Sequence, residues 1–202
     1  MKIKFCGLNP IRDVQVCIDN NVNYLGFVFY EKSPRNVNLQ DITILSKYNR
    51  KDSAFVAVTV NPKNEFIEKN LVGNFEFIQL HGSETSDRVS EIKNMGFKII
   101  KTIKINKEKD IDKYKEFNNA DIILFDTPGM EKSLKFPENL IDKLPKGEKY
   151  ALAGSISEDN VANISKLGVN FFDLSSSLES QLGYKDHLKI NSFINKFNEI
   201  KN

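Results

Sequence analysis

The 202-residue chain has no tryptophan, only two cysteines, only two histidines and no apolar run near the roughly 18 residues of a membrane span. Two cysteines give no disulfide framework. The formal net charge is only +2, and the lysines are spread along the chain instead of forming a basic patch. No apolar signal segment follows the first methionine. These absences predict a cytoplasmic protein with no membrane span and no nucleic-acid partner.

The overall amino-acid composition is typical of a soluble globular protein. Hydrophobic residues make up 40% and charged residues 28% of the chain. The length suits one domain with a sizeable core. No linker, low-complexity tract or clear internal repeat divides the sequence, so we expect residues 1–202 to form a single domain.

Short apolar runs alternate with amphipathic segments about eight times. Several runs are almost continuously apolar, which is typical of parallel strands covered by helices on the outside. Eight such units in about 200 residues predict the α/β class and a single-domain (β/α)8 TIM barrel with eight parallel strands. An open, doubly wound sheet is the rival, but no glycine-rich nucleotide fingerprint follows the first run. The predicted strands are Ile3–Cys6, Tyr24–Phe29, Ala54–Val60, Phe75–Leu80, Lys98–Ile103, Ile122–Asp126, Tyr150–Gly154 and Phe171–Leu174.

The intervening segments show helical spacing of apolar residues. Ile11, Val14, Cys17 and Ile18 form one stripe of a helix predicted over Ile11–Asn20. Similar stripes run through Leu39 to Tyr48 and through the C-terminal segment with Ile190, Phe193 and Phe197, whereas the fifth and sixth helical segments are weakly patterned. Because Cys17 lies on a core stripe, we expect it to be a packing residue.

Several predicted strands end in a reactive side chain. Active sites of such barrels lie at the C-terminal ends of the strands, so Cys6, His81 and Asp126 are candidates for one site. A thiolate can act as a general base where cations lower its pKa from about 8.5, although buried strand cysteines are also commonly structural. Asp126 can be either a carboxylate of the site or the N-cap of a helix. His81 can be either a residue of the site or a hydrogen-bonding partner of a neighbouring loop. Arg35 suits a solvated position or a bidentate carboxylate site.

The loops after the last two predicted strands have the character of an anion site. Gly154 allows a close backbone approach, and Ser157 is expected to cap a helix that begins near Glu158. Phosphate sites are frequent at these two loops of the barrel, although serine runs are also ordinary loop. The candidate phosphate ligands are Gly154, Ser155, Ser175, Ser176 and Ser177.

Two charged residues are expected to meet inside the barrel. Lys4 shares an inward face with Cys6, and a buried ammonium requires a partner. Asp173 faces inward on the eighth strand, which neighbours the first in a closed barrel, so we expect a Lys4–Asp173 ion pair. His187 follows Asp186 at the start of the last helix and is expected to be solvated.

These stretches together resemble the phosphoribosylanthranilate isomerase family of tryptophan biosynthesis. They occur in the family's order along nearly the whole chain, and the second of them is long and specific. The matching stretches are Lys4-Phe5-Cys6-Gly7, Gly26 to Arg35 (GFVFYEKSPR), Gln79-Leu80-His81-Gly82, Leu124-Phe125-Asp126-Thr127, Ala153-Gly154 and Asp173-Leu174-Ser175-Ser176.

The resemblance implies an Amadori rearrangement of N-(5-phosphoribosyl)anthranilate to 1-(2-carboxyphenylamino)-1-deoxyribulose 5-phosphate. By this resemblance Asp126 is the general acid and Cys6 the general base, Arg35 lies near the anthranilate carboxylate, and His81 lines the pocket. Gly154 and the loop of serines 175–177 bind the phosphate. No metal and no cofactor are implied, and both a monomer and a homodimer are compatible with the sequence.

Three departures from the family pattern affect the phosphate end. The loop after strand six, at positions 128–136, contains Glu131 and Lys132 in place of a glycine- and threonine-rich stretch. Ser155 and Ser177 replace glycines. Because the catalytic positions are intact, we expect retained chemistry with weaker substrate binding.

The sequence leaves three other functions as alternatives. A metal-dependent sugar-phosphate epimerase would require several histidine ligands, and this chain has two. A broader isomerase that also accepts a histidine-pathway aminoaldose would require phosphate sites related by two-fold symmetry, and the sequence lacks this symmetry. A degenerate barrel that binds a phosphorylated metabolite without this activity is the non-enzymatic alternative.

Overall fold

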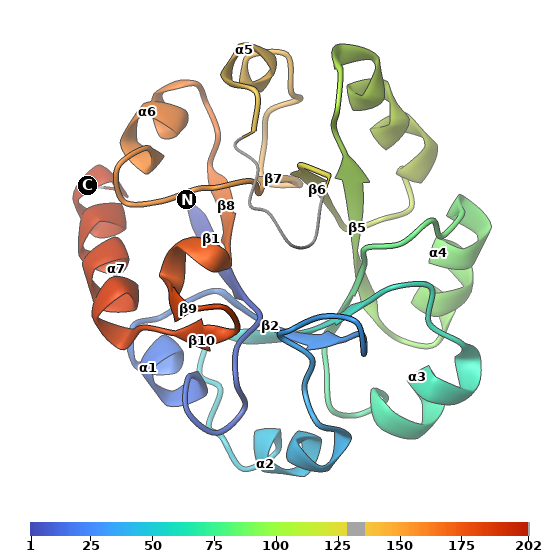
Figure 1. Ribbon diagram of the computed structural model, residues 1–202. Coiled ribbons are helices and arrows are strands. Elements are labelled where there is room, and N and C mark those ends of the chain that lie inside the picture. The colour runs from blue at the N-terminus through green and yellow to red at the C-terminus, as the bar shows by residue number, and fades with distance from the viewer. Residues whose placement is uncertain (129–135, 202) are drawn as a thin grey trace.

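The computed structural model describes residues 1–128 and 136–201. Eight parallel strands, β1 to β8, close into a barrel in chain order, and β1 pairs with β8. Figure 1 looks along the barrel axis, with the helical segments as an outer ring. The predicted barrel is therefore confirmed. The strands are β1 Lys2–Cys6, β2 Tyr24–Phe29, β3 Ala54–Thr59, β4 Phe77–Leu80, β5 Lys98–Lys104, β6 Ile122–Asp126, β7 Tyr150–Leu152 and β8 Phe171–Leu174.

The helical segments are short apart from the last one. They comprise α1 Val14–Asp19, α2 Ile42–Leu45, α3 Asn64–Asn70, α4 Ser86–Asn94, α5 Glu138–Ile141, α6 Val161–Lys166 and α7 His187–Lys201, with 3₁₀ segments η1 Leu39–Asp41, η2 Glu108–Phe117 and η3 Ser176–Leu178. The weakly patterned fifth segment is the 3₁₀ segment η2, and the sixth is the four-residue α5. A two-stranded antiparallel hairpin, β9 Glu179–Gln181 and β10 Tyr184–Lys185, follows β8.

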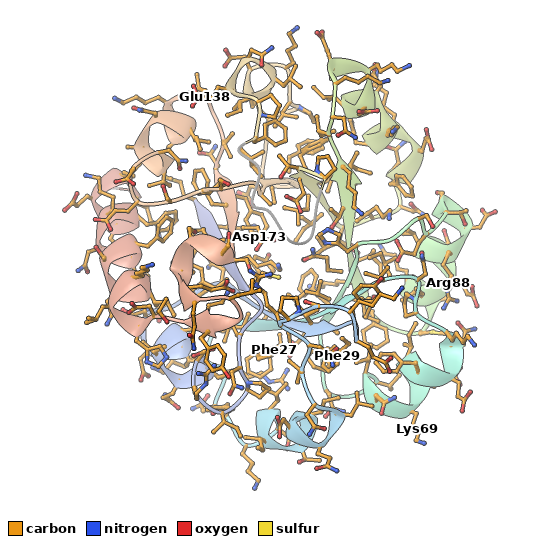
Figure 2. All side chains as sticks on the ribbon, viewed as in Figure 1. Phe27, Phe29, Lys69, Arg88, Glu138 and Asp173 are labelled. Carbon is orange, nitrogen blue, oxygen red and sulfur yellow. The ribbon has the colours of Figure 1, made fainter. Side chains whose placement is uncertain are left out.

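The period-two pattern of the strands separates two apolar layers. Odd-numbered residues of β1, such as Phe5, point outward into the layer between strands and helices, where Phe27 and Phe29 of β2 also pack. The second cluster lies inside the barrel and includes Val28, Ile100 and Leu124. Figure 2 shows Phe27 and Phe29 on the outer side of β2, and Asp173 near the barrel axis. The same alternation therefore aims the terminal side chains of β1 and β6 at the mouth of the barrel.

Aromatic rings close the barrel at the end opposite that mouth. Tyr24 stacks on Phe171 with ring centroids 5.0 Å apart, and it meets Phe77 edge-on at 5.3 Å. Directly above this layer, Lys4 pairs in register with Asp173 of the neighbouring strand. The N-terminal end of the barrel interior is therefore apolar, and Lys4 and Asp173 lie between it and the mouth.

Two details of the predicted helices are wrong. The first helix begins at Val14 and not at Ile11, whose side chain is 58% exposed, because residues 10–13 form a turn in which the carboxylate of Asp13 accepts the N–H of Asn9. The helix predicted near Glu158 begins at Val161.

Candidate active site

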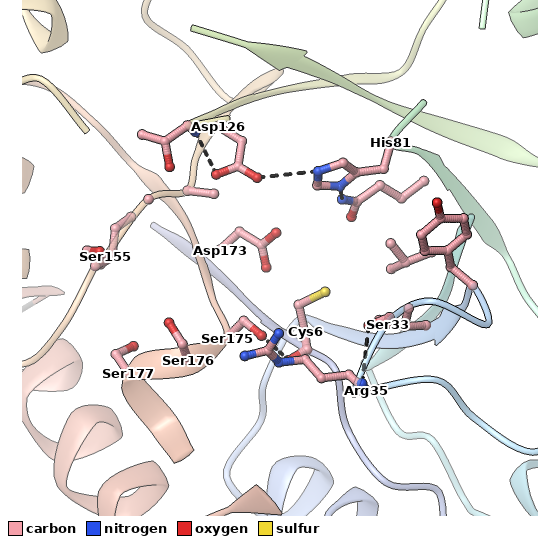
Figure 3. A pocket seen from close by; sticks show the side chains of 18 of the residues that line it. Cys6, Ser33, Arg35, His81, Asp126, Ser155, Asp173, Ser175, Ser176 and Ser177 are labelled. Carbon is pink, nitrogen blue, oxygen red and sulfur yellow. Dashed lines mark hydrogen bonds and ion pairs between the residues drawn. The ribbon is translucent and has the colours of Figure 1, made fainter. Parts of the chain in front are cut away.

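One pocket at the C-terminal ends of the strands contains all nine predicted site residues (Figure 3). Cys6 and Asp126 lie on opposite sides of it, with Asp173 between them. The serines of the phosphate loops lie on one side and His81 on the other. The residues that line it are Cys6, Val28, Tyr30, Ser33, Arg35, Val58, Val60, Gln79, His81, Asp126, Thr127, Ala153, Gly154, Ser155, Ile156, Asp173, Ser175, Ser176 and Ser177.

Asp126 is suited to hold a proton near neutral pH. Burial and the nearby carboxylate of Asp173 raise its pKa from 3.8 to about 7, although Oδ1 accepts the backbone N–H of Thr127 at 2.7 Å. Its other oxygen, Oδ2, lies 3.5 Å from Nε2 of His81. A carboxyl group with this pKa is present in both protonation states at physiological pH, as an acid catalyst requires.

His81 is a neutral imidazole in this pocket. Burial and the charge of Lys104 lower its pKa from 6.5 to about 4. Its Nδ1 atom lies 3.2 Å from Nε2 of Gln79, whose amide also donates to Thr102. If the amide of Gln79 donates to Nδ1, the imidazole proton resides on Nε2 and faces Asp126. In that tautomer the N–H of a neutral His81 faces the carboxyl group of Asp126 across 3.5 Å.

Cys6 shares the interior with the expected ion pair. Nζ of Lys4 lies 2.9 Å from Oδ2 and 3.0 Å from Oδ1 of Asp173, so the predicted pair is confirmed. Gly26 of β2 leaves space here, because a Cβ at that position would lie 3.2 Å from Nζ of Lys4 and 3.3 Å from Sγ of Cys6. Burial and the carboxylate of Asp173 raise the pKa of the Cys6 thiol, and the charges of Lys4 and Lys185 offset this rise only in part. The resting thiol is therefore protonated, and the two ammonium groups reduce the cost of forming the thiolate that a base requires.

Arg35 is held by a carboxylate of the protein itself. Its Nε and Nη2 atoms donate to Oε1 and Oε2 of Glu179 at 2.6 and 2.8 Å. The solvated alternative is thus wrong, and the bidentate geometry is present with a protein partner. A side chain at Gly7 would lie 2.5 Å from Cδ of Arg35, so this glycine gives the arginine access to the pocket.

The phosphate end is formed by two backbone segments. Gly154 and Ser155 have positive φ angles of 104° and 54°, and a serine adopts the second at a cost. Ser175 donates from Oγ to the carbonyl of Cys6 at 3.0 Å, which ties this loop to β1. The predicted cap by Ser157 is wrong: its N–H donates to Oδ1 of Asn160, which precedes α6. The strand-six loop departure at Glu131 and Lys132 lies outside the described residues.

Further residues of the site were not identified from the sequence. Gln79 could have been found, because it lies two residues before His81 and shares its inward face. Glu179 had no such signal, since it is distant in sequence from Arg35. Cys17 and His187 lie outside the pocket. Cys17 is fully buried among apolar residues, as expected. His187 is exposed, as expected, and its Nε2 atom also lies 3.0 Å from the buried carboxylate of Asp13.

The described part of the chain contains neither a metal-binding cluster nor a membrane-spanning helix. Residues 1–128 and 136–201 contain no cluster of three or more histidine, cysteine, aspartate or glutamate side chains that could hold a metal ion. Within the same residues, no helix has the length and apolar character needed to cross a membrane.

Comparison with known proteins identifies the family. The family model described as N-(5'phosphoribosyl)anthranilate (PRA) isomerase matches residues 3–196. The chain belongs to this family. A curated N-(5'-phosphoribosyl)anthranilate isomerase of Petrotoga mobilis is 35% identical over 100% of this chain and 99% of its own length. The enzyme of that name from Legionella pneumophila strain Corby is also 35% identical, over 96% and 95% of the two chains.

Solved structures of this isomerase family share the fold. The phosphoribosyl anthranilate isomerase of Thermotoga maritima superposes with a TM-score of 0.87 at 26% identity, covering 98% of this chain and 99% of that chain. Another isomerase structure, in complex with reduced 1-(o-carboxyphenylamino)-1-deoxyribulose 5-phosphate, gives 0.83 at 25% identity, with coverages of 98% and 99%. As a family member the chain is an isomerase of the intramolecular aldose–ketose class, an enzyme type of tryptophan biosynthesis.

Proposed function

We propose that the pocket converts N-(5-phosphoribosyl)anthranilate to 1-(2-carboxyphenylamino)-1-deoxyribulose 5-phosphate, with Asp126 as general acid and Cys6 as general base. Asp126 protonates the furanose oxygen, and the ring C1–O bond breaks as the amine nitrogen forms an iminium ion with C1. Cys6 removes the proton from C2, and the electron pair of that C–H bond forms the C1–C2 double bond of an enolamine. Proton transfer from the C2 hydroxyl to C1 completes the isomerisation.

The observation that carries this proposal is the position of the two groups across one pocket. Cys6 and Asp126 face each other from β1 and β6, so a furanose between them presents different atoms to each. Asp126 has a pKa of about 7 and the pKa of Cys6 is raised, so Asp126 loses its proton before Cys6 does as the pH rises. A minor form of the singly protonated pair has a protonated Asp126 and a Cys6 thiolate, the combination that the reaction uses.

The remaining groups orient the substrate. Gly154, Ser155 and the serines 175–177 line the side of the pocket that we assign to the phosphate. Arg35 is assigned to the anthranilate carboxylate, and the neutral His81 orients Asp126 through its Nε2 contact. The substrate's own nitrogen accepts the electrons, so this route requires no bound cofactor or metal. Residues 1–202 would act as one domain.

The fluorescence of the anthranilate group provides the test. Substrate is generated in place from anthranilate and phosphoribosyl pyrophosphate by a transferase, and its decay is followed with and without the protein. We expect rapid decay and a product with the mass of the substrate and a ketose carbonyl. A folded sample that does not accelerate the decay would overturn the proposal and favour a binding protein without this activity.

The assembly is also open to experiment. A solved structure shows generated monomers of the dimeric phosphoribosylanthranilate isomerase from Thermotoga maritima, and it is 25% identical to this chain with a TM-score of 0.82. For this chain we propose either a monomer or a homodimer with a complete pocket in each barrel. Light scattering at micromolar concentration separates the two, and a larger assembly would contradict both.

A further inference from the structure

The hairpin β9–β10 packs against the loop that carries Arg35. It follows η3 directly, and its two strands are joined through Gly183, which has a φ of 81°. A side chain at Gly183 would lie 2.7 Å from the carbonyl oxygen of Pro34, so the backbones of the hairpin and of the Arg35 loop are in close contact here. The hairpin is therefore fixed relative to the residue before Arg35.

Glu179, the first residue of the hairpin, connects two cations of the site. Its carboxylate accepts two hydrogen bonds from Arg35 and one from Nζ of Lys185 at 2.8 Å, and its side chain is only 5% exposed. Lys185 also donates to the carbonyl oxygen of Ser175 at 3.0 Å. Burial opposes ionisation of Glu179, but these hydrogen bonds outweigh it and lower its pKa. The carboxylate is thus charged and is fixed by three hydrogen bonds from two cations.

The geometry of Arg35 leaves one edge available. A guanidinium has five N–H donors, and Glu179 takes one from Nε and one from Nη2. Among residues 1–128 and 136–201, no other acceptor binds the guanidinium. Three N–H donors remain, two on Nη1 and one on Nη2. One N–H of Nη1 and the remaining N–H of Nη2 point in the same direction, so together they can bind both oxygens of a second carboxylate. Arg35 lines the pocket, and this pair of N–H donors is the edge that Glu179 leaves for a ligand there.

The charge of Arg35 is only partly compensated within the protein. Arg35 and Lys185 both bind Glu179, so two cations share one carboxylate. A ligand carboxylate at the free edge of Arg35 would therefore still be attracted to the guanidinium. Without Glu179, the flexible arginine side chain would lose the contact that fixes its plane, and aligning it would cost entropy on binding.

We propose that Glu179 is a positioning residue, which holds the guanidinium of Arg35 by one edge so that the other edge selects substrates with a carboxylate on the aromatic amine. This inference rests on the proposed function and deepens it. It makes the β9–β10 hairpin the element that distinguishes a carboxylated arylamine from a plain one.

The test compares two ligands that differ only in the carboxylate. One is reduced 1-(o-carboxyphenylamino)-1-deoxyribulose 5-phosphate, and the other is its phenylamino analogue. Calorimetry gives the dissociation constants of both for the parent and for Glu179→Gln. We expect the parent to prefer the carboxylated ligand by at least tenfold. In Glu179→Gln this preference should fall below threefold, while affinity for the phenylamino analogue changes by less than twofold.

Controls separate positioning from folding. Glu148→Gln removes a surface ion pair with Lys2 far from the pocket and should keep the full preference. If Glu179→Gln does not fold, Glu179→Asp is measured instead, since its shorter side chain cannot keep both bonds to Arg35 and should lose part of the preference. An unchanged preference, or equal weakening of both ligands, would overturn the inference. A parent that binds neither ligand would instead overturn the proposed function.

Discussion

The ammonium of Lys4 lies 2.9 Å from the carboxylate of Asp173, and both side chains are almost completely buried inside the barrel. They are paired in register across the β1–β8 seam, where the first strand meets the last. A buried ion pair stabilises the closed barrel little by itself, but removal of one partner leaves an uncompensated charge. The pair also lies beside Cys6 and contributes to the charge that acts on Asp126.

Lys4→Met is predicted to destabilise the protein by about 3–5 kcal/mol at neutral pH, because Asp173 would be left buried without its partner. The free energy of unfolding in urea measures this. Lys2→Met is the matched control on the same strand, since Lys2 pairs with an exposed glutamate, and it should cost less than about 1 kcal/mol. Equal losses from the two substitutions would show that the interior pair has no special importance.

Asp173→Asn is predicted to move the pH profile of kcat/KM to lower pH. The negative charge of Asp173 raises the pKa of Asp126 and also that of Cys6, so its removal lowers both. The singly protonated pair, which carries the activity, then exists over a lower pH range. Rates for the parent and the variant between pH 5 and pH 10 test this. The substrate phosphate titrates in the same way with both proteins, so it does not contribute to the difference between their profiles. An unchanged profile would contradict an effect of the Asp173 charge on the pKa values of Asp126 and Cys6.

Asp126→Asn is predicted to stabilise the fold at alkaline pH. Between pH 4 and pH 7 the folded parent holds a proton on Asp126 that the unfolded chain has lost, so its stability falls as pH rises through this range. The rise in pKa from 3.8 to about 7 corresponds to about 4 kcal/mol, which asparagine avoids. The stability difference between variant and parent should grow from near zero at pH 4 to this order at pH 8. A difference independent of pH would show that Asp126 ionises normally.

Ser155→Gly is predicted to stabilise the protein by up to about 1 kcal/mol, because glycine adopts the positive φ of this position without steric cost. The relaxed loop should also lower the KM for the phosphorylated substrate at unchanged kcat. Ser177→Gly serves as the comparison, since Ser177 lies in η3 outside the left-handed region and should be slightly destabilised. If both glycines act alike on Tm and KM, backbone strain at Ser155 is not the cause.

The part of the site that follows from strand alternation was predictable. Period two places Lys4, Cys6, Asp126 and Asp173 inside the barrel, and closure in chain order brings β1 beside β8. The partner of Arg35 was not predictable, because Glu179 is 144 residues away and reaches it only through a hairpin held by a backbone contact of Gly183. The start of α1 was also not predictable from apolar spacing. The spacing includes Ile11, but the hydrogen bond from the N–H of Asn9 to the carboxylate of Asp13 holds residues 10–13 in a turn, so the helix begins at Val14.

The two cysteines allow the most direct test of the proposed chemistry. Substrate decay is followed for Cys6→Ala and for Cys17→Ala, in which the replaced thiol is buried outside the barrel and away from the pocket. A general base contributes about 10²–10⁴-fold. The predicted result is a kcat at least a hundredfold lower for Cys6→Ala and within threefold of the parent for Cys17→Ala. A Cys6→Ala variant that keeps more than a tenth of the parent kcat would contradict the role of Cys6 as the base.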